Sequence, residues 1–385
     1  MSGMLGYRRS DGRIGVRNHV LVLSTVTCAN RVVQRIGFEF PEVICIEQAA
    51  GCMSLDDDRA ITHRMLSGLA LNPNVGAVIF VGLGCEHTPA RLLREEIGDA
   101  KPAQSIAIQA CGGSDEALAQ CREFVLRARE ELARQAPEPF GPDELVIASK
   151  CGGSDWTSAM ASNPAVGLVS DRSVAAGGIS MMGESAGWFG ADHILLARAR
   201  DEAVRVKIMA LMHRLYDAAQ HRGGRIDSGN PSPGNIAGGI TTLTEKAIGG
   251  IRKCGEKSPI EGLLAPGERA PGKGLWLLDN PSLDPASLAG MAAAGAQVIL
   301  FTTGRGTPVG SPLCPVIKIC ASAEGVRRMP GHVDVDISDI VTSGASMESG
   351  ADRIERALRE VAAGRTTRTE QLGHREFVMP QVGVL

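Results

Sequence analysis

The chain has 385 residues, a formal net charge of −3 and 44% hydrophobic residues. No cluster of Lys and Arg interleaves with aromatic residues, which excludes nucleic acid as the expected partner and favours small-molecule chemistry. No stretch reaches about eighteen uninterrupted apolar residues, and the start has no apolar core of signal-peptide length, so we expect a cytoplasmic protein without a membrane partner.

The first third of the chain alternates apolar runs with helical patterns. Strands are expected at 19–26, 43–47, 76–84 and 104–110, with helices at 28–37, 56–71, 88–98 and 115–135. Such an alternation predicts βαβ units and a parallel sheet.

The polar stretch 136–144 carries three prolines and is the expected linker. After it come expected strands at 144–149, 178–183, 274–279, 296–304 and 315–320, and helices at 164–176, 193–221, 241–254 and 349–363. Between them, 222–240 is expected to be a long functional loop. We therefore expect an α/β fold of Rossmann-like parallel sheets in two or three packed domains: an N-terminal domain over 1–138 and a C-terminal domain over 139–385 carrying the loops NPSPGN and FTTGRGTP.

The pentapeptide CGGSD occurs twice, at 111–115 and 151–155, each time after an apolar run. Besides Cys111, three glycine-flanked thiols follow expected strands: Cys52, Cys85 and Cys151. Such a trio can bind a catalytic metal ion with one open coordination position, or three irons of a four-iron cluster. The alternative is that all three are small residues at crowded turns.

A second group of polar residues suits an anionic ligand. Thr303, Arg305 and Thr307 lie on a glycine-hinged loop directly after an expected strand, where hydroxyls and a guanidinium favour a carboxylate over a plain turn. Asn230 and Asn235 of NPSPGN belong either to a lid with amide groups or to a rigid surface loop.

Five motifs, GYRRSDGRIGVRN, GLGCE, KCGGSDWTSAMASNPAVG, NPSPGNIAGGITTLTEKAIGGIRKCG and VILFTTGRGTPVGSPLCPVIKI, resemble the large catalytic region of the altronate and galactarate dehydratases. Near relatives of that family include the large subunit of sulfolactate sulfo-lyase. The resemblance implies a hydro-lyase, dependent on iron or another divalent metal, that dehydrates a sugar acid (an aldonate or aldarate) to a 2-keto-3-deoxy acid. In the sulfo-lyase relatives the leaving group is sulfite.

The resemblance also implies site residues. Only the second CGGSD aligns with the family motif, so Cys52, Cys85 and Cys151 are the expected ligands of Fe²⁺, an iron–sulfur cluster or another divalent metal ion. Glu184, Lys246, His87 and, as a second choice, Asp155 are the expected proton carriers, although His87 and Lys246 also suit a solvated surface position. The expected substrate-binding residues are Asn163, Asn230, Asn235, Thr303, Arg305 and Thr307.

Two positions depart from the family pattern, with Gln48 in place of a histidine and Gly187 in place of a second glutamate. The departures leave two rivals to dehydration: a lyase that expels sulfite from a sulfonated hydroxy acid, and a non-catalytic paralogue that binds acids. The family's small β-rich domain has no counterpart in this sequence, so we expect a separate small subunit as a partner, with a homo-oligomer as a further expectation.

Overall fold

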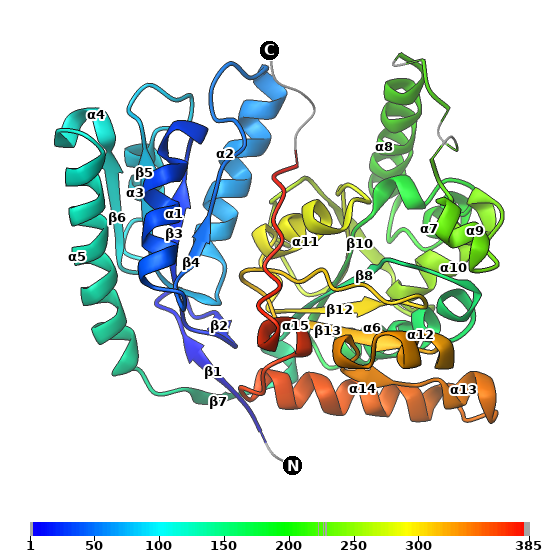
Figure 1. The fold of residues 1–385 in the computed structure, drawn as a ribbon. Coiled ribbons are helices and arrows are strands. Elements are labelled where there is room, and N and C mark those ends of the chain that lie inside the picture. The colour runs from blue at the N-terminus through cyan, green and yellow to red at the C-terminus, as the bar shows by residue number, and fades with distance from the viewer. Residues whose placement is uncertain (1–2, 222, 226, 228, 381–385) are drawn as a thin grey trace.

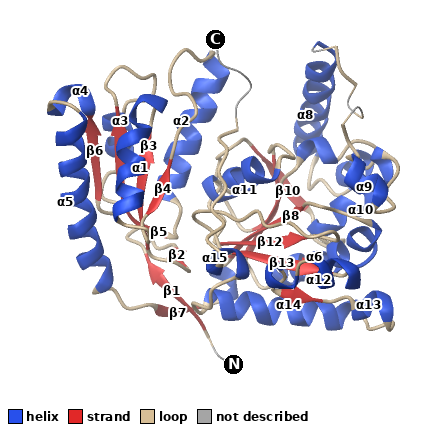
Figure 2. Ribbon diagram, viewed as in Figure 1, coloured by secondary structure: helices blue, strands red, loops and turns tan. Residues whose placement is uncertain are grey.

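The computed structural model describes residues 3–221, 223–225, 227 and 229–380 of the chain. Within these ranges the strands form three sheets, and two of them are parallel α/β layers that lie side by side (Figures 1 and 2). The expected α/β fold with Rossmann-like parallel sheets is confirmed.

The N-terminal unit contains a four-stranded parallel sheet in the order β4-β3-β5-β6. Its strands are β3 (His19–Ser24), β4 (Ile44–Ile46), β5 (Val75–Gly82) and β6 (Ala103–Ala107). Its helices are α1 (Asn30–Glu39), α2 (Asp56–Leu71), α3 (Ala90–Ile97), α4 (Ile108–Cys111) and α5 (Ser114–Ala133). All eight residues of β5 are buried because α1 and α5 pack on one face of the sheet while α2 and α3 pack on the other.

A small antiparallel sheet joins the start of the chain to the connector between the units. It pairs β1 (Met4–Arg8) with β2 (Ile14–Gly15) and with β7 (Glu138–Phe140). The expected linker at 136–144 therefore contains a strand, and the expected boundary between 138 and 139 lies inside it. Strand β7 is too short to show a hydrophobic pattern in the sequence. It forms a strand because it pairs with β1, which is far away along the chain.

The C-terminal unit contains a seven-stranded parallel sheet in the order β10-β11-β9-β8-β12-β13-β14. The strands are β8 (Val146–Cys151), β9 (Ile179–Met182), β10 (Ile260–Leu264), β11 (Gly274–Leu278), β12 (Val298–Thr302), β13 (Val316–Cys320) and β14 (Val335–Asp336). The helices are α6 (Asn163–Ala175), α7 (Asp192–Ala197), α8 (Glu202–His221), α9 (Pro233–Ala237), α10 (Leu243–Ile251), α11 (Asp284–Ala293), α12 (Ala323–Arg328), α13 (Asp339–Thr342), α14 (Met347–Ala362) and α15 (Arg368–Gln371).

The strand order of this sheet reverses beside β8. The chain passes from β8 to β9 on one side, and after β11 it crosses to β12 on the other side of β8. Loops leave such a point in opposite directions, which opens a crevice at the carboxyl ends of the two strands. The topology therefore places a ligand site beyond Cys151.

Two expectations from the sequence differ from the structure. The single helix expected at 193–221 is divided into α7 and α8, because Ala199 bridges to Ile260 and the Arg198 guanidinium donates hydrogen bonds to backbone oxygens of the neighbouring 254–258 loop. The long loop expected at 222–240 contains the short helix α9, and its residues 222, 226 and 228 lie outside the described residues.

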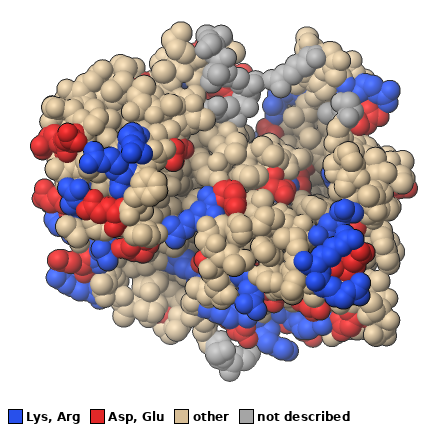
Figure 3. Space-filling model, viewed as in Figure 1, with Lys and Arg blue, Asp and Glu red and all other residues tan. Residues whose placement is uncertain are grey.

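The surface is mixed in charge. On the face in Figure 3, acidic and basic side chains are interspersed over the N-terminal unit. Among the described residues, no helix is both long and apolar enough to cross a membrane.

The two units share one hydrophobic core. It combines Leu21, Met65 and Leu69 of the N-terminal unit with Leu288 and Phe301 of the C-terminal unit. Where α2 crosses α11 the backbones are in direct contact, since a Cβ added to Gly68 would lie 2.4 Å from the backbone oxygen of Ala293. Beside this contact the Asn72 amide donates to the backbone oxygens of Ala292 and Ala296 at 2.7 and 2.9 Å.

We predict that Gly68→Ala lowers the free energy of unfolding by about 1–3 kcal/mol, because overpacking forces the helices apart. At a solvent-exposed position in a helix, replacing glycine with alanine stabilises a protein by about 1 kcal/mol. A loss of stability on Gly68→Ala is therefore due to the contact between α2 and α11. Gly272→Ala, in a bend before β11, is the control for an added methyl group alone, since nothing lies within 4 Å of its Cβ. Urea unfolding of both variants measures the difference, and a Gly68→Ala protein as stable as the wild type would contradict it.

Candidate active site

A cavity of about 270 Å³ lies at the carboxyl edge of the seven-stranded sheet. Four of its lining residues come from the ends of parallel strands: Cys151 ends β8, Glu184 follows β9, Asp284 begins the helix after β11, and Arg305 follows β12. Parallel strands place their carboxyl ends at one edge, so these four side chains meet although they are far apart in sequence.

A network of buried charges forms the floor of this cavity. Lys150 donates to Glu184 and contacts the Asp284 carboxylate at 3.1 Å. Lys253 contacts the other Glu184 oxygen and the Cys151 sulfur, both at 3.1 Å. The Cys151 backbone N–H also donates to Glu184 at 3.1 Å. Because both lysines are fully buried, each ammonium needs these partners.

The charges of the network hold one another in the ionised form. Burial alone would raise the pKa of Glu184, but the ammonium groups of Lys150 and Lys253 outweigh it and lower that pKa to about 2. Burial would lower the pKa of Lys150, but the charges of Glu184 and Asp284 outweigh it and raise that pKa above its usual value. Glu184 is therefore a permanent anion at neutral pH and a weak base.

The backbone of Glu184 is unusual. Its φ of 83° and ψ of 50° lie in the left-handed region, which costs a residue with a side chain on the order of 1–3 kcal/mol. Strain of this kind persists where surrounding contacts fix it, and here three contacts hold the carboxylate. The conformation turns Glu184 back toward β8.

Lys246 lies at the mouth of the cavity, half-buried on α10. Its ammonium donates to the side-chain oxygens of Asn230 and Asn235 at 2.6 and 3.0 Å. Asn235 is itself fixed, since its amide nitrogen donates to the backbone oxygen of Ser154 at 2.9 Å. Burial lowers the pKa of Lys246 below its usual value, only partly offset by the charges of Cys151 and Glu184.

Arg305 also lines this cavity, and its guanidinium makes no hydrogen bond or ion pair with any described residue. The two threonines expected beside it have other partners. The Thr303 hydroxyl accepts the Gly306 N–H at 3.0 Å, and the Thr307 hydroxyl accepts the Val309 N–H at 3.4 Å. The threonines shape the loop, and the guanidinium is free for an anion.

Two more of the expected site residues make hydrogen bonds that stabilise the fold. Asn163 is buried, donates to the Gly249 backbone oxygen at 2.9 Å and accepts the Thr302 hydroxyl at 2.6 Å, so both ends of its amide hold neighbouring parts of the fold. Asp155 accepts the Thr157 hydroxyl and the Ser158 N–H at 2.7 and 3.0 Å, which stabilises the first turn leading into α6. Neither residue lines the cavity of Cys151.

The remaining expected residues lie in the N-terminal unit. Cys52 and Cys85 are exposed in loops after β4 and β5, and the His87 N–H joins these loops by donating to Gly51 at 3.2 Å. The loops belong to the four-stranded sheet, whereas Cys151 belongs to the seven-stranded sheet. No group of three or more His, Cys, Asp or Glu side chains among the described residues is arranged to hold a metal ion. The structure therefore does not bring the three thiols together.

Gln48 occupies the position of the family histidine in the same region. Its side chain is fully buried, and neither its amide nitrogen nor its oxygen has a hydrogen-bond partner. A buried amide without partners costs free energy, so this position is not built for packing alone.

Lys150, Lys253 and Asp284 are site residues that the motifs alone did not single out. The sequence did contain a signal for the two lysines, because each lies beside an apolar run. Lys150 ends the stretch ELVIASK, and Lys253 comes two residues after IGGI. Lysine is almost never fully buried unless it is paired. Asp284 carried no such signal, because an acidic residue at a helix start is ordinary.

Lys318 is a further buried lysine, and it lies in the same row of the sheet as Lys150. Lys150 on β8 and Lys318 on β13 both pair with Phe301 on β12, so the three side chains share one face. The Lys318 nitrogen lies 3.4 Å from the centre of the Phe301 ring and has no hydrogen-bond partner. Burial lowers the pKa of Lys318 to about 7, an effect that the charge of Asp284 opposes.

We predict that Lys318→Met stabilises the protein most at pH 7 and below. Between pH 7 and 10.5 the unfolded chain binds a proton that the folded chain does not, so stability of the wild type rises with pH in this window. The gain from Lys318→Met therefore shrinks toward pH 10.5. Thermal unfolding across this range measures it, with the exposed Lys257→Met as control; identical pH profiles for Lys318→Met and wild type would refute the prediction.

Comparison with known proteins agrees with the motifs. The family model described as D-galactarate/Altronate dehydratase, C-terminal, matches residues 142–385, and that described as D-galactarate dehydratase/Altronate hydrolase, second domain, matches residues 6–133. The chain is 35% identical to (2R)-sulfolactate sulfo-lyase subunit beta of Chromohalobacter salexigens, over 98% of this chain and 97% of that protein.

Two further relatives are dehydratases. Altronate dehydratase of Escherichia coli is 33% identical over 98% of this chain and 77% of its own length. Galactarate dehydratase (L-threo-forming) of the same organism is 32% identical over 94% of this chain and 72% of its own length. The resemblance seen in the motifs is confirmed, and the chain belongs to the galactarate/altronate dehydratase family of lyases.

Proposed function

We propose that the chain dehydrates a sugar acid, an aldonate or aldarate, to a 2-keto-3-deoxy acid. The observation that carries the proposal is one cavity lined by a half-buried amine, a buried thiol and a guanidinium that has no partner in the part of the chain that the structure describes. Dehydration beside a carboxylate needs an anion-binding group, a base for the α-proton and an acid for the departing hydroxide.

Arg305 is the proposed carboxylate-binding group. A guanidinium can donate two parallel hydrogen bonds to a carboxylate, and this one has no competing partner among the described residues. Binding at Arg305 places the substrate over Cys151 and Glu184, which line the same cavity. Two ammonium groups beneath them, those of Lys150 and Lys253, stabilise the negative charge that develops on the enolate.

Lys246 is the proposed base. Desolvation lowers its pKa, so the neutral amine is present at lower pH than for a free lysine. Asn230 and Asn235 accept hydrogen bonds from its nitrogen and thereby fix its position. Glu184 suits this role less well, because its low pKa makes it a weak proton acceptor.

Cys151 and Lys253 form the proposed acid. The thiol lines the cavity, and the Lys253 ammonium contacts its sulfur at 3.1 Å. When the thiol gives its proton to the departing hydroxyl, the Lys253 ammonium keeps its own proton and stabilises the thiolate that remains. Water leaves the substrate, and the enol product tautomerises to the keto acid.

Iron, or another divalent metal, is a proposal that rests on the family resemblance, and the arrangement of the residues does not fit it. The Glu184 carboxylate is already paired with two ammonium groups, and Cys151 has a third cation, Lys246, nearby. A metal cation beside Cys151 would add to this positive charge. The mechanism above therefore uses side chains alone.

A second reaction is favoured by one feature of the cavity. At Gly187, the position of the family's second glutamate, the nearest neighbour of an added Cβ is the Glu184 Cβ at 3.8 Å. The glycine leaves space beside the reacting groups that could hold a sulfonate. We therefore propose sulfite elimination from a sulfonated hydroxy acid as the alternative, in line with the name of the sulfo-lyase relative.

A separate small subunit is the proposed partner. The sulfo-lyase relative, which this chain matches over 97% of its length, is named as subunit beta of its enzyme. We propose a comparable two-subunit assembly here, within a homo-oligomer in the cytoplasm.

We predict that Lys246→Met lowers kcat by about 10²- to 10⁴-fold, the usual contribution of a general base. KM should change little, because Arg305 still binds the carboxylate. In the wild type, kcat should rise with pH as Lys246 loses its proton, at a pH below the ordinary lysine range. The steady-state pH profile of both proteins measures this.

Two controls separate a base from a mere cation. Lys246→Arg keeps the charge but cannot deprotonate, so it should be as inactive as Lys246→Met. Lys257→Met removes an exposed lysine and should leave kcat unchanged. Full activity of Lys246→Arg would overturn the assignment of Lys246 as base.

The reaction itself is tested by a substrate screen. Purified chain, alone and with its candidate small subunit, is incubated with aldonates, aldarates and sulfonated hydroxy acids, and both α-keto product and sulfite are measured. Keto product without sulfite supports dehydration, and equimolar sulfite supports the alternative. Binding without turnover, with metal restored according to metal analysis, would identify an acid-binding paralogue and refute both reactions.

A further inference from the structure

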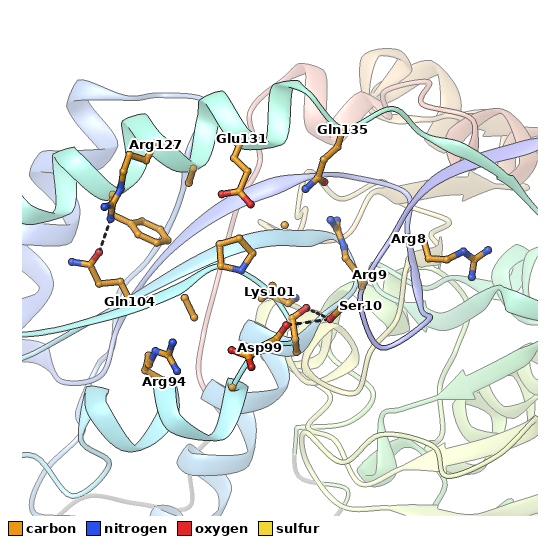
Figure 4. Close-up of a pocket in the computed structure, with 17 residues that line it drawn as sticks. Arg8, Arg9, Ser10, Arg94, Asp99, Lys101, Gln104, Arg127, Glu131 and Gln135 are labelled. Carbon is orange, nitrogen blue, oxygen red and sulfur yellow. Dashed lines mark hydrogen bonds between the residues drawn. The ribbon is translucent and has the colours of Figure 1, made fainter.

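A second polar cavity, of about 660 Å³, lies in the N-terminal unit. It is at the amino edge of the four-stranded sheet, since its lining includes Gly76 at the start of β5 and Lys101 just before β6. The catalytic candidates described above do not line it. Figure 4 shows Arg127 and Glu131 extending from α5 on one side of the cavity, with Arg94, Asp99 and Lys101 on the other.

The cavity contains more cations than its protein partners neutralise. Its lining has five basic side chains, Arg8, Arg9, Arg94, Lys101 and Arg127, and two acidic ones, Asp99 and Glu131. Only Arg8 is fully paired with carboxylates, those of Glu138 and Glu144 outside the cavity lining.

The buried cations of this cavity have neutral partners. Lys101 donates to the backbone oxygens of Asn72 and Val75 at 2.9 and 2.8 Å, which leaves one of its three N–H groups unused. Arg9 donates to the backbone oxygens of Pro73 and Arg17 and to the amide oxygen of Asn18. Burial, followed by the charge of Arg9, lowers the pKa of Lys101 well below its usual value. An anion in the cavity would relieve this cost.

Two basic groups, one half-buried and one exposed, are available to such an anion. Arg94 makes no side-chain hydrogen bond or ion pair with a described residue, and Arg127 contacts the Gln104 amide oxygen at 3.1 Å and Glu123 only at 3.7 Å. Asp99 and Glu131 also have no side-chain partner among the described residues. A simple anion such as phosphate would be repelled by these carboxylates, whereas hydroxyl groups would donate hydrogen bonds to them.

We propose that this cavity binds a small polyhydroxy acid, with its carboxylate at Arg94, Arg127 and Lys101 and its hydroxyls at Glu131 and Asp99. Pro102 and Phe124 supply an apolar wall for the carbon chain. The site is distinct from the proposed active site and does not depend on the reaction proposed above.

The position of the cavity links it to the contact between the units. Lys101 holds the Asn72 backbone oxygen, and the Asn72 side chain holds Ala292 and Ala296 of the C-terminal unit. A ligand that orders Lys101 therefore strengthens an anchor of α11. Because ligand binds the folded state only, it is expected to raise the temperature of thermal unfolding.

The test measures binding in an Arg305→Gln background, which weakens the other acid site. Calorimetric titration uses gluconate as the polyhydroxy acid, with acetate, sorbitol and inorganic phosphate as comparison ligands. Gluconate is expected to bind at one site and to raise the unfolding temperature. Adding Arg94→Gln and Arg127→Gln should weaken its binding by about ten-fold or more, the loss expected for charge-assisted hydrogen bonds.

Matched variants identify the groups. Arg91→Gln on α3 and Glu130→Gln on α5 remove exposed charges outside this cavity and should leave gluconate affinity unchanged. Glu131→Gln should reduce the preference for gluconate over acetate. The proposal is overturned if gluconate does not bind the Arg305→Gln protein, if Arg94→Gln with Arg127→Gln leaves its affinity unchanged, or if phosphate binds more tightly. Loss of turnover plays no part in this readout, so failure here leaves the proposed reaction untouched.

Discussion

The pairing of Glu184 with two buried ammonium groups is the constraint on which the rest of the C-terminal unit depends. Removing one member of such a buried network leaves an uncompensated charge, which costs roughly 3–5 kcal/mol. The carboxylate joins β8, β9 and the end of α10, because its partners Lys150, Cys151 and Lys253 come from these elements. The same contacts hold Glu184 in its left-handed backbone conformation, so stability and site geometry rest on one set of interactions.

The network also determines which groups are left to react. Glu184 and Asp284 balance the charges of Lys150 and Lys253, and the four groups supply a fixed field under the cavity. Lys246 and Arg305 stand above this floor, where one has a lowered pKa and the other has no partner among the described residues. Fixed charges below the cavity and one amine of lowered pKa above it suit the proposed enolate chemistry, since the field must exist before the proton moves.

Much of the fold follows from hydrophobic periodicity, because most of the parallel strands are largely apolar runs and helix patterns follow many of them. The short strands β7, β10 and β14 escape this reasoning, since tertiary pairing rather than composition makes them strands. The site was predicted in part. Arg305, Glu184, Cys151 and Lys246, which the sequence singled out, line one cavity, and their roles stay predictions.

The sequence could not show which thiols share a site, because the rule used to group them is local. Cys52, Cys85 and Cys151 each follow a strand, yet the first two belong to one sheet and the third to another. Sequence order does not show where one sheet ends, whereas strand pairing does. The buried lysines were missed for a related reason: a charged residue at the end of an apolar run reveals its role only once its partners, tens of residues away, are in place.

The contact at Gly68 makes the two halves of the chain depend on each other for solubility. The α11 surface that meets α2 consists of alanines, methionine and leucine, and in the intact protein it is covered by Met65 and Leu69. A fragment beginning near residue 142 lacks α2 and would present this surface to water. The C-terminal unit expressed without the N-terminal unit should therefore aggregate, although it retains every residue that lines the Cys151 cavity.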